Sequence, residues 1–211
     1  MVGVVAELGY PETRVVDIIK RAGVSRKTFY ELFEDKEDCF LAAYDQAVGL
    51  LYEGTEDAFE LAAPGPWAER LRVALARFLA MMADEPDLAK FCVVDVLAAG
   101  PKALARRDAA IRQFTGFIDA GRTESRRELP GITSLSLAGG INELIYSEII
   151  HGASAELPQR LPEIIFWVTQ PFLGTESAEA ERRRARELMA NGPPRPQREG
   201  RDQDRRPGVS R

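Results

Sequence analysis

Cysteine and histidine are scarce in this chain of 211 residues, which has two cysteines and one histidine. A structural zinc site normally needs four Cys or His ligands and a disulfide framework needs several cysteine pairs, so we expect no metal, no disulfide and no cofactor. The sequence also lacks an apolar run long enough for a membrane span and a basic secretory leader, so we expect no membrane partner. Together these absences predict a protein of the reducing cytoplasm.

Catalytic signatures are missing as well. The sequence contains no glycine-rich phosphate loop, no nucleophile elbow and no cluster of histidine with carboxylates, so we expect that the chain is not an enzyme. Its hydrophobic fraction of 45% and charged fraction of 29% are typical of globular proteins. The length fits one ordinary domain, or a small domain fused to a larger one.

Apolar residues recur at helical spacing along most of the chain, and no segment alternates convincingly as a strand would. This pattern predicts an all-α protein, with helices at about residues 2–8, 14–22, 26–33, 36–60, 67–83, 87–98, 102–121, 133–151 and 162–172. It also predicts domains at 1–45 and 46–174. Residues 175–190 could extend as a charged helix, but four prolines follow and little apolar surface can be buried, so we expect 175–211 to be a charged, largely disordered tail.

Positive charge is concentrated near the N-terminus, although the whole chain has a net charge of −5. Residues 13–30 hold five basic side chains, including Arg14, and one acidic side chain, which gives this segment a charge of +4. Because salt screens distant charges, a local patch decides whether a surface attracts a polyanion. The acidic total therefore does not exclude a nucleic-acid partner.

The same basic segment has the pattern of two short helices joined by a glycine turn. Thr13 would cap the first helix, Gly23 would end it in a left-handed conformation, and Ser25 would cap the second. We expect the second helix to bury Phe29, Leu32 and Phe33, and to leave a polar, basic face outward that consists of Arg26, Lys27, Thr28 and Tyr30. This arrangement predicts a helix-turn-helix.

A helix of this kind fits the major groove of DNA, where residues near its start reach base edges. Arg26 and Lys27 can donate to guanine, and Thr28 can touch a base. Tyr30 and the capped helix ends at Thr13 and Ser25 can bond phosphates, and Lys36 would lie beside the DNA backbone. Because exposed helix pairs also occur in bundles that bind no DNA, the spacing alone leaves both interpretations open.

The string AELGYPETRVVDIIKRAGVSRKTFYELFEDKEDCFLAAYD closely resembles the DNA-binding domain of the tetracycline-repressor-like (TetR) family of bacterial transcription regulators. The matching motifs are GY before the second helix, T-x-x-x-D-I, the AGVS turn, TFY, and F-x-x-K-E before the long helix. The resemblance implies phosphate contacts from Thr13, Ser25 and Tyr30, base readout by Arg26, Lys27 and Thr28, and backbone contact by Lys36. It implies a double-stranded DNA partner and a ligand-released repressor that acts as a homodimer on a palindromic operator.

The sequence departs from the family pattern in two places. Leu32 occupies a position where the family usually has histidine, so a phosphate contact that some members make is absent. Only Met1 to Leu8 precede the GY motif, where the family usually has a basic arm and a full first helix. We therefore expect an incomplete first helix, a native start further upstream, and tighter DNA binding by an extended chain.

Residues 46–174 resemble the helical ligand-binding and dimerisation domain of the family more weakly, which implies an unknown small-molecule effector. The pocket candidates are Trp67, Phe78, Met82, Phe91, Asp95, Phe114, Phe117 and Tyr146, although such aromatic and methionine residues also fit an ordinary core. A glycine inside a helix suggests a close helix approach, and the helix at 162–172 is apolar on nearly every side, which predicts a dimer interface. The interface candidates are Leu137, Gly140, Ile141, Leu144, Ile145, Ile165, Val168 and Phe172, for which the alternative is again the core.

Two other functions stay open at this point. The chain could be a helical adaptor that binds protein, or a small-molecule-binding protein whose helix-turn-helix does not bind DNA productively because the N-terminus is incomplete. DNA binding falls steeply with salt because counterions are released from phosphates, whereas a protein groove responds little. Salt dependence therefore discriminates between these hypotheses.

Overall fold

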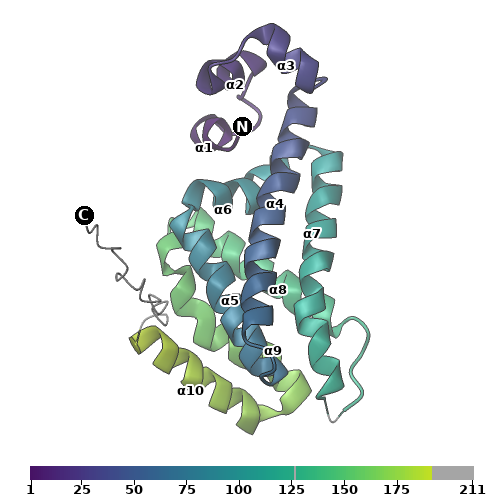
Figure 1. The fold of residues 1–211 in the computed structure, drawn as a ribbon, viewed down its shortest axis with the longest axis vertical. Helices are drawn as coiled ribbons and strands as arrows, with labels where there is room; N and C mark the ends of the chain where they lie inside the picture. Colours follow the sequence, from purple (N-terminus) through teal and green to yellow (C-terminus); the bar gives the residue numbers. More distant parts are fainter. Residues whose placement is uncertain (126, 192–211) are drawn as a thin grey trace, which may run out of the picture.

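The computed structural model describes residues 1–125 and 127–191, and these residues form helices and no strand (Figure 1). The α-helices are α1 (Val2–Leu8), α2 (Val15–Ala22), α3 (Arg26–Leu32), α4 (Lys36–Leu61), α5 (Trp67–Asp84), α6 (Pro86–Val93), α7 (Pro101–Asp119), α8 (Thr133–Ile150), α9 (Leu161–Leu173) and α10 (Thr175–Asn191). Short 3-10 helices lie at Asp95–Ala98, Ala120–Thr123 and Ser154–Arg160. The all-α prediction is confirmed, and in the described residues no helix is long and apolar enough to cross a membrane.

Among the helices predicted for residues 2–172, the largest difference concerns residues 87–98. There α6 ends at Val93 and the chain tightens into a 3-10 helix, in which the Leu97 amide donates to the Val94 carbonyl at 3.1 Å. Gly100 then adopts a positive φ of 99°, and Pro101 opens α7. Proline suits the first turn of a helix because it has no amide hydrogen to donate, so the Gly-Pro pair sets the start of α7.

Helix α4 joins the two parts of the molecule. Its 26 residues span about 39 Å, from the small head formed by α1, α2 and α3 to the far end of the helical body (Figure 1). The Asp35 carboxylate caps it by accepting from the Asp38 amide at 2.9 Å. One face of α4 buries Phe40, Tyr44 and Leu51 against the body. Movement of this helix therefore changes the position of the head.

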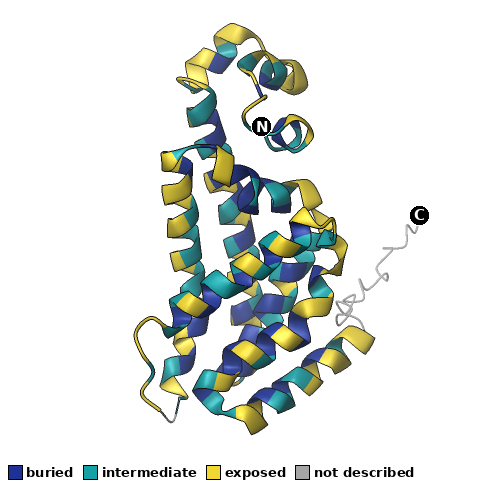
Figure 2. Ribbon diagram, turned by 180° about the vertical axis from the view of Figure 1, so that it is seen from behind, coloured by how far each residue is buried: buried dark blue, intermediate teal, exposed yellow. Residues whose placement is uncertain are grey.

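Two hydrophobic clusters hold the fold together. The larger one runs through α4 to α9 and includes Val5 of α1, so α1 connects the head with the body. The smaller one, inside the head, consists of Ile18, Phe29 and Cys39 with partly buried neighbours. Figure 2 shows buried residues filling the interior of the body, and exposed residues make up most of α3 and half of α2. The head thus depends on a very small core.

The charged helix that the sequence allows at 175–190 forms, and this part of the predicted tail is ordered. Residues Thr175–Asn191 form α10, which packs against α9 and α5. Ala178 and Ala185 are buried there, and Glu181 pairs with Arg72 of α5 at 3.1 Å. The helix has no stripe of large apolar residues; small buried side chains and a buried ion pair hold it against the body instead. Residues 192–211 lie outside the described residues.

Candidate nucleic-acid interface and ligand cavity

The turn between α2 and α3 has the geometry that the sequence predicts. Gly23 is left-handed, with φ 66° and ψ 28°, and the Val24 amide donates to the Ile19 carbonyl at 3.2 Å. Ser25 caps α3, because its Oγ accepts from the Thr28 amide at 3.0 Å. Phe29 is buried with Ile18, which fixes α3 against α2. This local arrangement is the helix-turn-helix.

Within the described part of the chain, the outer face of α3 is exposed. Arg26, Lys27 and Tyr30 are exposed, and α3 lies at the end of the molecule that is opposite α10 (Figure 1). The Arg26 guanidinium lies 5.6 Å from the Tyr30 ring centroid, and Lys27 is 3.7 Å from Glu31. Solvent-exposed contacts of this kind contribute little free energy. Arg26 and Lys27 can therefore leave them and bind the phosphates or bases of a polyanion.

Three predicted details of this region need correction. Thr13 is 1% exposed, its hydroxyl donates to the Gly9 carbonyl at 2.8 Å, and the N-cap of α2 is Arg14. Thr13 therefore holds the turn before α2, and its hydroxyl hydrogen is already donated within the chain. Leu32 is 69% exposed, because α3 ends there and the extended backbone of Phe33 turns that ring inward in its place.

Lys36 occupies a more specific position than the sequence indicated. Its Nζ donates to the Tyr10 carbonyl at 2.9 Å and to the Pro11 carbonyl at 3.4 Å, and lies 4.2 Å from the Tyr10 ring centroid. Lys36 therefore ties the start of α4 to the loop before α2. An ammonium has three donors, so one donor remains for a phosphate.

Arg14 is exposed and bonded to Asp17. The Arg14 Nε lies 3.2 Å from the Asp17 carboxylate, whose hydrogen bond with Arg14 lowers the pKa of Asp17. The same hydrogen bond raises the pKa of Arg14. Arg14 therefore stays cationic at the N-terminus of α2, at the edge of the basic segment.

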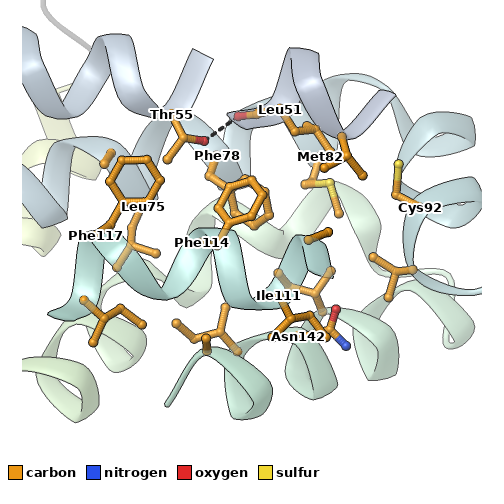
Figure 3. A pocket seen from close by; sticks show the side chains of 18 of the residues that line it. Leu51, Thr55, Leu75, Phe78, Met82, Cys92, Ile111, Phe114, Phe117 and Asn142 are labelled. Atoms are coloured by element: carbon orange, nitrogen blue, oxygen red, sulfur yellow. Dashed lines mark hydrogen bonds between the residues drawn. The ribbon is translucent and has the colours of Figure 1, made fainter. Parts of the chain in front are cut away.

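A cavity of about 100 Å³ lies inside the body, between α4, α5, α6, α7 and α8. Its wall is almost entirely apolar, and Figure 3 shows Phe78, Phe114 and Leu75 directed toward the same space. The polar members of the wall are Tyr44, Thr55, Arg107 and Asn142. Thr55 is already satisfied, since its hydroxyl donates to the Leu51 carbonyl at 2.6 Å. The cavity is suited to an apolar ligand with few polar groups.

Half of the predicted pocket residues line this cavity, namely Phe78, Met82, Phe114 and Phe117. The other four do not. The Trp67 indole donates to the Phe117 carbonyl at 2.8 Å and packs on Phe172 outside the cavity wall.

Each of the remaining three has another role or position. Phe91 packs against Phe40, with ring centroids 4.6 Å apart. Asp95 pairs with Lys90 at 2.7 Å, and Tyr146 is partly buried in the core but not in the cavity wall. The sequence showed which residues are apolar, but it did not show which of them come together from different helices to form the cavity wall.

Cys92 lies in the cavity wall, although it is not among the predicted pocket residues. Burial raises the pKa of its thiol to about 12, from an ordinary value of 9.0. Burial also raises the pKa of the Tyr44 hydroxyl, which donates to the Cys92 carbonyl at 3.4 Å. Both groups therefore stay protonated at neutral pH and are unsuited to acid–base chemistry.

The raised pKa predicts that Cys92 is nearly inert in the folded protein. A pKa raised from 9.0 to about 12 lowers the thiolate fraction about 1000-fold below pH 9, and the thiolate is the species that reacts. Alkylation by iodoacetamide at pH 8, followed by mass spectrometry, should be at least that much slower than for the guanidinium-unfolded chain. Since the unfolded thiol ionises first, this residue should also reduce stability as pH rises from about 9 toward 12. Equal rates for folded and unfolded protein would contradict the assigned burial.

The predicted dimer-interface residues are mostly core residues of a single chain. Leu137, Ile141, Ile145, Ile165, Val168 and Phe172 are buried, and Ile141 and Ile145 line the cavity. Leu144 is partly buried against the same core. Gly140 does permit a close approach, but within the chain, because a Cβ there would overlap the ring of Trp167 from α9. The apolar sequence at 162–172 is explained by burial within the chain, because most apolar side chains of α9 are buried.

Among the described residues, no group of three or more His, Cys, Asp or Glu side chains could hold a metal ion. The head and the cavity are therefore the two candidate sites, one for a polyanion and one for an apolar molecule.

A family model matches the head, and similar proteins extend over the body as well. Residues 3–43 match the family described as bacterial regulatory proteins, tetR family. The chain is 24% identical, over 155 residues, to the fatty acid metabolism regulator protein of Bacillus subtilis (strain 168), covering 74% of this chain and 76% of that protein.

Two solved structures share the fold. The transcriptional regulator FadR from Bacillus subtilis, solved in complex with stearoyl-CoA, has a TM-score of 0.71 at 19% identity and covers 82% of this chain and 94% of that one. The fatty acid degradation regulator FadR from Bacillus halodurans has a TM-score of 0.70 at 17% identity, covering 79% and 92%. The resemblance in fold thus extends well beyond the head, into the helical body.

Proposed function

We propose that the chain, whose residues 3–43 match the tetR family of bacterial regulatory proteins, is a repressor that acts as a homodimer on a palindromic operator and is released by a fatty-acyl ligand. The observation that carries this proposal is the pairing of an exposed basic recognition helix with an apolar cavity, both connected to α4. We propose no catalytic step for the cavity, and we place the protein in the bacterial cytoplasm, where its DNA partner is.

DNA recognition would use the start of α3. Its N-terminus, capped by Ser25, presents Arg26, Lys27 and Thr28 to base edges in the major groove. Tyr30 and Lys36 would contact phosphates on either side, and Arg14 adds positive charge at the edge. Thr13 has no direct contact in this proposal because it is buried. In a dimer, two such heads about 34–36 Å apart match the two half-sites of a palindrome.

The effector would insert an acyl chain into the cavity. The wall is apolar along its length, from Met82 and Cys92 at one side of Figure 3 to Phe117 at the other. A related fold was solved with stearoyl-CoA, whose acyl chain has the chemistry that such a wall can bind. We therefore propose a long-chain fatty-acyl compound as the effector.

Release of DNA requires that the ligand bind one arrangement of the heads better than the other. A chain of aromatic contacts connects the cavity with the head: Tyr44 packs on Phe91, Phe91 on Phe40, and Phe40 on Tyr10, with centroid distances of 6.3, 4.6 and 4.9 Å. Tyr10 is in turn held by Lys36. A ligand that shifts Tyr44 would therefore change the support of the head.

The homodimer would use the outward faces of α8 and α9. These faces retain exposed apolar side chains, including Ile150 at 50% and Trp167 at 44% exposure. Burying them between two copies would remove apolar surface from water. The interface would thus lie on the opposite sides of α8 and α9 from the residues that form the core.

Selection of bound fragments from the genomic DNA of the source organism tests the function. The chain should enrich one or a few palindromic fragments, and stearoyl-CoA should release it from them. Coenzyme A without an acyl chain is the matched control and should leave the complex intact. Recovery of fragments without a shared sequence would contradict the proposed function, and failure of stearoyl-CoA to release the protein would contradict the proposed effector.

A further inference from the structure

Arg107 is the one charged side chain in the cavity wall formed by the described residues. It lies near the start of α7, its side chain is 22% exposed, and its Nε is buried without a hydrogen-bond partner in the described part of the chain. The nearest recorded carboxylate is that of Asp108, with 3.9 Å between Nη1 and Oδ1, and no hydrogen bond joins these atoms. Arg107 therefore belongs to the cavity wall and has one donor, its Nε, unused among the described residues.

A buried N–H without a partner is costly, and more so when it belongs to a charged group. Neighbouring cations on α7 do not share this condition. The Lys102 ammonium donates to Glu37 of α4 at 2.9 Å, and the Arg106 guanidinium donates to Asp45 of α4. The fold thus provides acceptors for the cations that face α4 and none for the Nε of Arg107. An oxygen atom from a bound molecule would supply the missing acceptor.

The cavity has a polar end and an apolar end. Arg107 lies close enough to Tyr44 for its charge to act on that hydroxyl, which in turn bonds the Cys92 carbonyl. Ile118 lies eleven residues further along α7, about 16 Å away at the rise of a helix. Figure 3 places Cys92 and Asn142 toward one side and Phe117 toward the other. A linear molecule could therefore lie along α7 with its polar end at Arg107.

Resting on the proposed function, we propose that Arg107 anchors the effector by donating its Nε hydrogen to an oxygen at the head of the acyl chain. The ligand class is a linear apolar chain that ends in a thioester carbonyl or a free carboxylate. Its methyl end points toward Phe117 and Ile118. Arg107 is thus a residue that determines which apolar molecules the cavity accepts, because a chain without the oxygen leaves the cation unsatisfied.

The test is a cycle in which Arg107 and the ligand oxygen are removed separately and together. Calorimetry measures binding of stearoyl-CoA, of its S-octadecyl thioether analogue that lacks the carbonyl, and of stearate, to the wild-type chain and to Arg107→Met. Loss of a hydrogen bond to a charged group should weaken stearoyl-CoA about 10- to 100-fold in the variant. The thioether should bind both proteins within about threefold of each other, because it has no oxygen to lose. If stearate shows the larger loss, the carboxylate is the natural head; if stearoyl-CoA does, the thioester is.

Two controls separate this inference from a general loss of structure. Arg112→Met removes the same type of side chain from an exposed position of α7 and should leave all ligand affinities unchanged. Arg107→Met should keep the melting temperature and the operator affinity of the wild type. Arg107→Lys should lose most of the affinity for stearoyl-CoA that Arg107 contributes, because lysine lacks the Nε donor.

Equal binding of stearoyl-CoA and of stearate by the wild type and Arg107→Met would overturn the role of Arg107 while leaving the effector class intact. A variant that loses the thioether as strongly as stearoyl-CoA would overturn it too, since Arg107 would then only shape the cavity. A wild-type chain that binds neither acyl ligand would overturn both the inference and the proposed effector, whereas DNA binding would still stand.

Discussion

Replacing Arg26 and Lys27 together by alanine is expected to abolish sequence-specific DNA binding. Both side chains are exposed at the start of α3, and each bidentate base contact contributes about 1–3 kcal/mol to discrimination between base pairs. Loss of both should weaken operator binding by about 2–6 kcal/mol, or about 30- to 20,000-fold. Fluorescence anisotropy with the selected operator and with a scrambled duplex measures the effect at a fixed salt concentration.

Arg112→Ala together with Arg183→Ala is the matched control for this variant. It removes the same charge from exposed positions of α7 and α10, far from the head, and should leave operator affinity within about threefold of the wild type. The head variant should melt at the wild-type temperature, because neither side chain is in a core cluster. If the variant keeps its preference for the operator over the scrambled duplex, α3 is not the recognition helix.

The change Glu181→Gln is expected to cause the largest loss of stability. Glu181 and Arg72 form a buried pair with side chains 6% and 11% exposed and 3.1 Å between Nε and Oε2. Removing one partner of a buried pair leaves an uncompensated charge and costs about 3–5 kcal/mol. In a protein of this size, each kcal/mol lowers the melting temperature by about 2–4 °C, so a decrease of about 6–20 °C is expected in a thermal scan followed by circular dichroism.

A second carboxylate of the same helix provides the control. Glu179 pairs with Arg182 at 3.3 Å but is 40% exposed, and exposed pairs contribute at most about 1 kcal/mol. Glu179→Gln should therefore change the melting temperature by no more than a few degrees. If the two substitutions lower the melting temperature equally, α10 is held by its alanine packing, and the ion pair with Arg72 adds no more stability than an exposed pair.

The head could be predicted from the sequence largely because short-range interactions determine it. Gly23 supplies the left-handed turn, and Ser25 caps α3 with its own side chain, so four or five neighbouring residues contain the information. The failures at Thr13 and Leu32 have another origin. Thr13 folds back onto Gly9, and Leu32 is exposed because α3 ends one residue earlier than expected. Neither fact follows from helical periodicity.

The body was harder to predict because residues distant in the sequence form its site. The apolar residues of α8 and α9 could serve a dimer or a core equally well, and the structure uses them as core. Arg107 could not be singled out among the other arginines, because its importance lies in the acceptor that its Nε lacks. A charged helix at 175–190 could be read from the sequence, but its packing could not, because Glu181 of α10 pairs with Arg72, more than a hundred residues away.

Operator affinity as a function of salt tests the central claim most directly. If the basic face of α3 binds DNA, affinity for the selected operator should fall about 1000-fold or more between 50 and 200 mM salt, and the specific complex should stay tighter than the complex with a scrambled duplex throughout. An affinity that changes little over this range, or that is equal for both duplexes, would contradict the assignment of the head as a DNA-reading domain.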